Sequence, residues 1–364
     1  MKKRFTFVFI IALVSIFTFA GWESTGHKKI NYFSTVFFPY EMSAFKAWNY
    51  SLSSHASDAD TRKSTDPSED IKHYINMDSY SRFLSSGTIS QNIADANQYW
   101  GILPWATITA VDSLTAEFKR KDWQKAILTA SDLGHYVGDG HNPLHITQNY
   151  NGRTSSQKGI HSRYEGDMID KYSYQITFTA DSVNCIENIP DFVFSYLYEN
   201  YKYVDSIFLA DDYAHTISTD TKSTAYYDAL WSRTKPFTIK LFNNAAKRLA
   251  TLIYTAWTNA GKPQLNTSFT EKLGTVLNGF ELYQNYPNPF NPETKIKFSV
   301  PTASKVKLKL FDTTGKEILT LIDEEKQKGV YEYTLNASSL PSGIYFYNIS
   351  TGSYSVTKKM VLLK

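Results

Sequence analysis

The 364-residue sequence predicts a mainly α-helical domain followed by a small all-β, immunoglobulin-like sandwich. Between residues 22 and 262, apolar residues recur at spacings of three and four, the period of a helix with one buried face. From residue 280 to residue 364, apolar and polar residues alternate, as they do in strands that bury one face. Residues 263–279 separate the two patterns and are predicted to be a polar linker.

The first 21 residues are predicted to be a signal peptide. A basic stretch at residues 2–4 precedes an apolar run from Phe5 to Ile16, with small residues after it. A membrane anchor is the alternative, but the run falls short of the ~18 apolar residues that span a bilayer. Cleavage after Ala20 leaves Gly21 as the first residue, and cleavage after Gly21 leaves Trp22. We therefore expect an exported protein, secreted or held at the cell surface.

The helical part, residues 22–262, contains four segments with clear helical periodicity. One of them places Trp123, Ala126, Ile127, Ala130, Leu133 and Val137 on a single face. The predicted helices cover residues 92–119, 122–138, 191–208 and 236–260.

The β part, residues 280–364, contains alternating segments separated by turn signals. Turns are predicted at residues 301–303, 313–315 and 341–343, which are rich in Pro, Gly, Ser and Thr. The number of short strands fits a small sandwich. The alternating apolar residues are Ile296, Phe298 and Val300, then Val306, Leu308 and Leu310, then Tyr331, Tyr333 and Leu335.

Charge and cysteine content restrict the function. Residues 22–279 carry 24 Lys and Arg against 27 Asp and Glu, a net charge of −3. This part of the chain has no basic surface with which to hold a polyanion, so an anionic substrate would have to be held by bound metal. The lone Cys185 excludes an intramolecular disulfide.

A spaced set of histidines and acids is the strongest chemical signal. His135 and Asp139 lie four residues apart on a predicted helix, and His161 and Glu165 repeat this spacing. His145 lies between the two pairs. Imidazole and carboxylate ligands together are typical of zinc sites. Further candidates upstream are His27, Asp60 and His73, whereas His55, His141 and His215 receive no role.

The segments Gly134-His-Tyr-Val-Gly-Asp139, Asn142-Pro-Leu-His145 and Gly159-Ile-His-Ser-Arg-Tyr-Glu165 resemble those of bacterial zinc-dependent phospholipase C. The same superfamily includes the single-strand-specific zinc nucleases. The resemblance covers roughly residues 22–260 and implies that superfamily's helical fold and three Zn²⁺ ions. The ligands it implies are Asp60, His73, His135 and one oxygen of Asp139 for the first zinc, His145, His161 and Glu165 for the second, and the other Asp139 oxygen, His27 and the terminal amine and carbonyl of Trp22 for the third.

Such a cluster would activate water for attack on phosphorus, and Asp60 is the candidate catalytic residue that orients the water or accepts its proton. Asp58 competes for this role. We prefer Asp60 because the run from Ala56 to Asp60 then matches the family's pattern of a small residue before the Asp. The third zinc depends on Trp22 being the mature N-terminus.

The substrate class stays open between a phospholipid and a single-stranded nucleic acid. Glu165 is typical of the phospholipases, because the nucleases have Asp at this position. Tyr74 and Asn76 follow the ligand His73 and are candidate substrate-binding residues, since a ring there could stack on a base. Thr25, Thr61 and Asp70 do not match the choline pocket of the phospholipases, so no choline preference is expected.

A non-catalytic, zinc-containing surface binding protein is the alternative from another class. The filled ligand positions favour an enzyme. Turnover of a phosphodiester by protein with about three zinc ions per chain would separate the two. No obligate protein partner is evident from the sequence.

The C-terminal segments Tyr286-Pro-Asn-Pro-Phe-Asn-Pro292, Leu340-Pro-Ser-Gly343 and Lys358-Lys-Met-Val-Leu-Leu-Lys364 resemble the sorting domain of type IX secretion cargo. The resemblance implies that the secretion machinery is a partner and that this domain directs the chain across the outer membrane. A carbohydrate-binding or structural immunoglobulin-like domain is the alternative.

Overall fold

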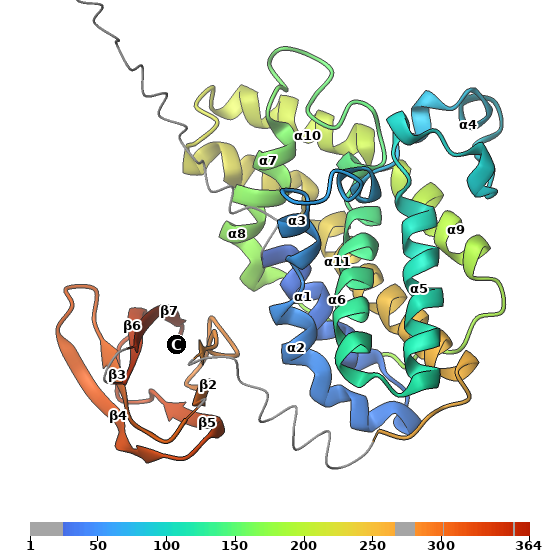
Figure 1. Ribbon diagram of the computed structural model, residues 1–364. Coiled ribbons are helices and arrows are strands. Elements are labelled where there is room, and N and C mark those ends of the chain that lie inside the picture. Colours follow the sequence, from blue (N-terminus) through green and yellow to red (C-terminus); the bar gives the residue numbers. More distant parts are fainter. Residues whose placement is uncertain (1–24, 266–280, 301, 352–353) are drawn as a thin grey trace, which may run out of the picture.

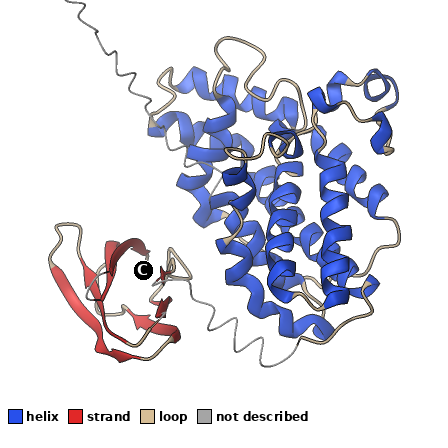
Figure 2. Ribbon diagram, in the orientation of Figure 1, coloured by secondary structure: helices blue, strands red, loops and turns tan. Residues whose placement is uncertain are grey.

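A computed structural model describes residues 25–265, 281–300, 302–351 and 354–364. The helices run from Thr25 to Asn259 and the strands begin at Glu281, which confirms the predicted order of a mainly α domain and a β-sandwich (Figure 2). The predicted signal peptide, Trp22 and most of the predicted linker lie outside the described residues. No helix among the described residues is both long and apolar enough to cross a membrane.

The helical domain is a bundle around α5, α6 and α11 (Figure 1). Short 3-10 turns connect many of its helices. Those used below are η3 (Asp70–His73) and η7 (Pro143–His145), together with the π-helical segment η8 (Arg163–Met168). The α-helices are α1 (Thr25–Ser34), α2 (Asn49–Ser54), α3 (Asp58–Arg62), α4 (Ser81–Ser86), α5 (Leu103–Arg120), α6 (Trp123–Gly140), α7 (Ile160–Ser162), α8 (Ile169–Tyr172), α9 (Ile189–Tyr201), α10 (Val204–Ile217) and α11 (Thr224–Asn259).

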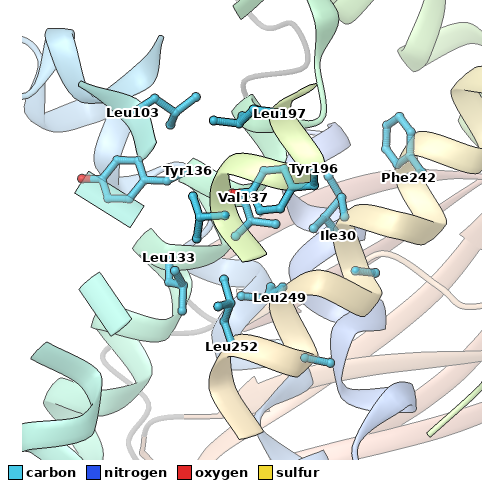
Figure 3. Close-up of a cluster of buried hydrophobic side chains, with 14 of the residues drawn as sticks. Ile30, Leu103, Leu133, Tyr136, Val137, Tyr196, Leu197, Phe242, Leu249 and Leu252 are labelled. Atoms are coloured by element: carbon cyan, nitrogen blue, oxygen red, sulfur yellow. The ribbon is translucent and has the colours of Figure 1, made fainter. Parts of the chain in front are cut away.

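The core of the bundle forms where α1, α6 and α11 face one another. Ile30 of α1, Val137 of α6 and Leu249 of α11 are fully buried and lie in one cluster (Figure 3). Their burial stabilises the fold by about 1.5–3 kcal/mol per side chain. The same packing fixes α6 against α1, and these two helices carry the candidate ligands His27, His135 and Asp139.

The predicted helix at 92–119 is wrong at its start, because α5 begins only at Leu103. The side chains of Asn92 and Asn97 accept hydrogen bonds from the backbone N–H groups of Ala94 and Tyr99, both at 3.0 Å. These local bonds favour 3-10 turns over a continuous helix.

Two further helix boundaries differ from the prediction. The segment predicted at 191–208 divides into α9 and α10, with a turn at residues 202–203. The last helix begins at Thr224 rather than at residue 236, because Ser223 caps it and buried residues such as Trp231 extend its apolar face. Pro236 lies inside α11, although a proline is more often found in the first turn of a helix.

The β-sandwich consists of two antiparallel sheets with strand orders β1-β2-β5 and β4-β3-β6-β7. The alternation predicted for β2 and β3 is confirmed, since their inward residues, such as Phe298 and Leu308, are fully buried. The strands are β1 (Glu281–Leu282), β2 (Glu293–Val300), β3 (Ser304–Phe311), β4 (Glu317–Lys326), β5 (Gly329–Asn336), β6 (Gly343–Thr351) and β7 (Tyr354–Leu362).

Candidate metal centre

Helix α1 packs closely against α6, which brings His27 of α1 next to His135 and Asp139 of α6. A Cβ atom at Gly138 would lie 2.6 Å from His27 Nδ1, and one at Gly134 would lie 1.9 Å from Asn31 Oδ1. Only glycine therefore leaves room for α1 at these positions. Asn31 holds the approach by donating from Nδ2 to the carbonyl of Ser131 on α6 at 3.1 Å.

The first group of candidate ligands comes from α3, η3 and α6. His73 Nδ1 lies 3.0 Å from Asp139 Oδ2 and 3.5 Å from Asp60 Oδ1. His135 Nε2 lies 3.4 Å from the same Asp60 oxygen, 3.5 Å from Asp139 Oδ2 and 3.0 Å from His73 Nδ1. Tetrahedral zinc with ligands at about 2.0–2.2 Å separates its donors by roughly 3.3–3.6 Å. The spacing of these four donors therefore fits a zinc ion.

The second oxygen of Asp139 faces a different neighbour. His27 Nε2 lies 3.3 Å from Asp139 Oδ1, and the His27 ring stacks on His135 with centroids 3.8 Å apart. Asp139 therefore presents its two oxygens to two groups of histidines. His27, His135 and Asp139 have donor atoms close enough together to hold one ion.

A further group lies where η7 meets α7 and η8. His145 Nε2 lies 3.0 Å from Glu165 Oε2, and His161 Nε2 lies 3.1 Å from Glu165 Oε1. The side chains of His145 and His161 are 14% and 25% exposed. Those of His135 and Asp139 are only 1% exposed. This group is therefore more exposed to solvent than His135 and Asp139 are.

Backbone carbonyls fix the orientation of two of these rings. His135 Nδ1 donates to the carbonyl of Ala56 at 2.7 Å, and His145 Nδ1 donates to the carbonyl of His73 at 2.7 Å. In the neutral form of both rings the proton then resides on Nδ1, which leaves the lone pair of Nε2 for a metal ion. This tautomer is the one that a metal ligand requires.

The carboxylates and imidazoles of the centre shift each other's pKa values strongly. Burial lowers the pKa of His135, but Asp139 and Asp60 outweigh burial and raise that pKa to about 9. The pKa of His145 is raised to about 9 in the same way by Asp139 and Glu165. Despite its burial, Asp139 has a pKa well below its ordinary range, because His145 and His135 stabilise the charged form. Bound cations would supply the positive charge that these carboxylates now draw from protons.

Asp58 and Asp60 lie on opposite sides of the short helix α3. Asp58 Oδ2 pairs with His55 Nδ1 at 2.7 Å, and both side chains are more than 40% exposed. Asp60 instead faces His73 and His135. The pKa of Asp60 lies below the ordinary range, since His135 and Lys63 outweigh the effect of burial.

The predicted substrate residues Tyr74 and Asn76 follow His73 in an extended stretch. His73, Ile75 and Met77 are buried, whereas the two alternate side chains are half-buried on the other face. The backbone N–H of Ile75 donates a hydrogen bond to the carbonyl of His145 at 2.9 Å, which holds this stretch beside the group of His145, His161 and Glu165.

Two residues that the sequence did not indicate lie at the rim of the centre. Tyr150 is 54% exposed, and its ring meets the His161 ring edge-on at a centroid distance of 5.6 Å. Lys63 Nζ lies 2.7 Å from Asp60 Oδ1. Burial lowers the pKa of Lys63, but Asp60 and Asp139 outweigh it and raise that pKa, so the side chain remains a cation.

Glu165 lies in the π-helical segment η8, which a buried ion pair anchors. Arg163 Nη2 donates to both oxygens of Asp211, at 3.0 and 3.1 Å, and Arg163 Nε donates to the hydroxyl of Tyr226 at 2.7 Å. Asn142 Nδ2 donates to Glu165 Oε2 at 2.5 Å. A π-helical turn requires such support, and such turns often occur at functional sites.

Replacement of Arg163 by Met is expected to destabilise the protein by about 3–5 kcal/mol, because the buried Asp211 carboxylate then loses its cationic partner and keeps the hydroxyl of Tyr226 as a hydrogen-bond donor. Chemical denaturation of the full chain measures this. The matched control is Arg153→Met, whose partner Asp205 is 71% exposed, and for which a loss below about 1 kcal/mol is expected. A loss for Arg163→Met no larger than that of the control would contradict the anchoring role.

Fold and site together define a class: a helical domain with three groups of His and carboxylate donors that fit metal ions, joined to a small β-sandwich. Residues 284–363 match the family model described as the secretion system C-terminal sorting domain. The sorting domain predicted from the sequence is thereby confirmed, and it supports export to the cell surface or beyond the cell.

The solved structures similar to the chain include two clostridial alpha-toxins. That of Clostridium absonum shares 12% identity at a TM-score of 0.43, with 95% of this chain and 97% of the toxin covered. That of an avian strain of Clostridium perfringens shares 10% identity at a TM-score of 0.39, with 94% and 97% covered. No curated protein matches the chain. Likeness at this level assigns no activity, so the chemistry of the site follows from its side chains.

Proposed function

We propose that this protein is an exported, zinc-dependent phosphodiesterase of phospholipase C type that holds three Zn²⁺ ions. One observation carries the proposal: eight side chains far apart in the sequence converge in three groups whose donor atoms have metal-ligand spacing. They are His27, Asp60, His73, His135, Asp139, His145, His161 and Glu165. Trp22, proposed as a further ligand of the third zinc, lies outside the described residues.

Zinc bound by these groups would supply Lewis acidity toward phosphoryl oxygens and lower the pKa of water. The protein's part is to hold the donors in place. Asp139 joins two of the groups through its two oxygens, which sets the distance between them. The buried rings around it exclude bulk water, which strengthens every electrostatic interaction in the centre.

Asp60 and Lys63 are the residues placed to act on the reacting groups. The Asp60 carboxylate is 17% exposed at the edge of the first group, where it can orient a water molecule or accept its proton. Lys63 is a cation beside that carboxylate. A phosphate oxygen arriving at the centre would find in Lys63 a neutralising charge, in a part of the chain whose net charge is −3.

A second candidate function is cleavage of single-stranded nucleic acid. The exposed Tyr150 ring beside His161 favours it, because an aromatic face next to the metal ligands can stack on a base. Tyr74, which is half-buried, could contribute to the same surface. Glu165 favours the phospholipid, which remains our first choice.

A substrate panel on the zinc-loaded full chain tests the proposal. The panel contains phosphatidylcholine and phosphatidylethanolamine vesicles, single-stranded DNA, RNA and a 3′-nucleotide. Release of a phosphorylated headgroup supports the phospholipase assignment. Activity on nucleic acid without activity on phospholipid would contradict the phospholipase assignment and support a nuclease. Full zinc content without turnover of any ester would contradict an enzyme and support a zinc-containing binding protein.

The sorting domain gives a prediction about location. A chain that ends before residue 284 is expected to remain inside a host with type IX secretion, whereas the full chain reaches the surface or the medium, because residues 284–363 carry the address. Cell fractionation followed by immunoblotting measures this. Asp139→Asn in the full chain is the control and should be exported normally. Equal export of the truncated chain would contradict the sorting role.

A further inference from the structure

His73 differs from His135 and His145 in the ring nitrogen that faces the other candidate ligands. Its Nδ1, not its Nε2, faces Asp60 and Asp139. A neutral imidazole whose Nδ1 binds a metal carries its proton on Nε2, and that N–H needs an acceptor. His73 Nε2 is buried and has no hydrogen-bond partner among the described residues.

Glu69 lies one helical turn before His73, in the direction of that nitrogen. Its Oε1 is 3.7 Å from His73 Nε2, just beyond hydrogen-bond distance. The Glu69 side chain is only 2% exposed. A buried carboxylate is costly unless hydrogen bonds and cations satisfy it.

Several donors surround the Glu69 carboxylate and hold it in this position. The hydroxyl of Tyr136 donates to Oε1 at 2.5 Å, and Lys72 Nζ donates to Oε2 at 2.8 Å. Arg62 Nη2 donates to Oε1 at 3.3 Å and is itself held by Asp132 Oδ2 at 2.9 Å. Tyr136 is the neighbour of His135 on α6, so the same helix that carries two ligands also fixes Glu69.

We infer that Glu69 is a positioning residue that accepts the Nε2–H of His73 and thereby fixes its Nδ1 toward the first zinc. This role rests on the proposed function of His73 as a ligand. Glu69 would supply the acceptor that the buried Nε2–H of His73 does not find among the other described residues. A shift of either side chain by a few tenths of an ångström would bring Glu69 Oε1 within hydrogen-bond distance of His73 Nε2. Carboxylates behind metal-bound histidines orient the ring and increase its basicity.

Competitive zinc titration of the full chain, with the variant Glu69→Gln, tests this role. Gln keeps the shape of the side chain but loses the charge. We expect the zinc affinity of the first group to fall 10–100-fold, while that of His145, His161 and Glu165 stays unchanged. The proton spectrum of the zinc-loaded wild type should contain a downfield His73 Nε2–H signal that shifts upfield in the variant, because a neutral amide oxygen is a weaker acceptor than a carboxylate.

The matched control is Glu117→Gln, since Glu117 is also 2% exposed and hydrogen-bonded, to Thr129, but lies on α5 outside all three groups. It should bind zinc as the wild type does. If Glu69→Gln does not fold, Tyr136→Phe removes one donor to Glu69 and should give a smaller loss of the same affinity. Wild-type zinc affinity and an unchanged His73 signal in a folded Glu69 variant would overturn the role. A wild type that binds no zinc at the first group overturns the metal centre itself, whereas zinc binding without esterase activity contradicts only the proposed function.

Discussion

Asp139→Asn is expected to remove two of the three zinc ions and to lower phosphodiester turnover at least 10³-fold. The substitution keeps the shape of the side chain but replaces one anionic oxygen with an amide nitrogen that cannot bind a metal. Both oxygens are engaged, Oδ2 with His73 and Oδ1 with His27, so either orientation of the amide disrupts a group. A 10³-fold loss corresponds to about 4 kcal/mol of transition-state stabilisation.

Metal analysis and steady-state kinetics on the same preparation measure this effect. Asp122→Asn is the control on the same helix, because Asp122 is an exposed N-cap residue and Asn caps a helix equally well. The control should retain full zinc content and full turnover. Three zinc ions in the Asp139 variant would mean that the carboxylate does not join the two groups.

His145→Ala is expected to remove one zinc ion, the one held with His161 and Glu165, and to leave the other two. Turnover should fall roughly 10²–10³-fold, since a phosphoryl oxygen then loses one Lewis acid, which is worth several kcal/mol. The variant also removes the donor to the carbonyl of His73, which costs about 1–3 kcal/mol of stability. Circular dichroism therefore accompanies zinc analysis and kinetics.

His55→Ala is the matched control for the loss of an imidazole. His55 is 42% exposed, pairs only with Asp58 in the described part of the chain and lies outside the three groups. It should keep three zinc ions and the wild-type rate. Near wild-type turnover in the His145 variant would instead show that the second group takes no part in the reaction.

The pairing of His135 with Asp139 and of His161 with Glu165 could be predicted from helical spacing, whereas the other candidate ligands were expected from the family resemblance. The choice between Asp58 and Asp60 could not be made on the same ground. It depends on how the five-residue helix α3 is rotated, and that rotation is set by tertiary contacts with His73 and His135. Trp22 remains a prediction.

Other features of the site depend on contacts that no local pattern indicates. Glu69 and Lys63 are ordinary charged residues in the sequence, and only the fold brings them to the ligands. The π-helical turn at Glu165 depends on Asp211, which lies 48 residues from Arg163 along the chain. Gly134 and Gly138 belong to the family-like segment, but their role as the contact surface for α1 appears only when the helices pack.

The fold class could be predicted because helical and alternating patterns occupy separate parts of the chain. The errors lie at helix ends, where side-chain bonds such as those of Asn92 and Asn97 compete with the helix. They do not displace the candidate ligands, because α6, which carries His135 and Asp139, has both a sharp start at Asp122 and a continuous apolar face.

An anomalous difference map from crystals of the full chain, recorded at the zinc absorption edge, tests the central claim most directly. Three peaks are predicted: one among Asp60, His73, His135 and Asp139, one among His145, His161 and Glu165, and one beside His27 at the other oxygen of Asp139. Crystals grown with zinc that show no peak at the first two groups, with the carboxylates bonded directly to the histidines, would contradict the metal centre.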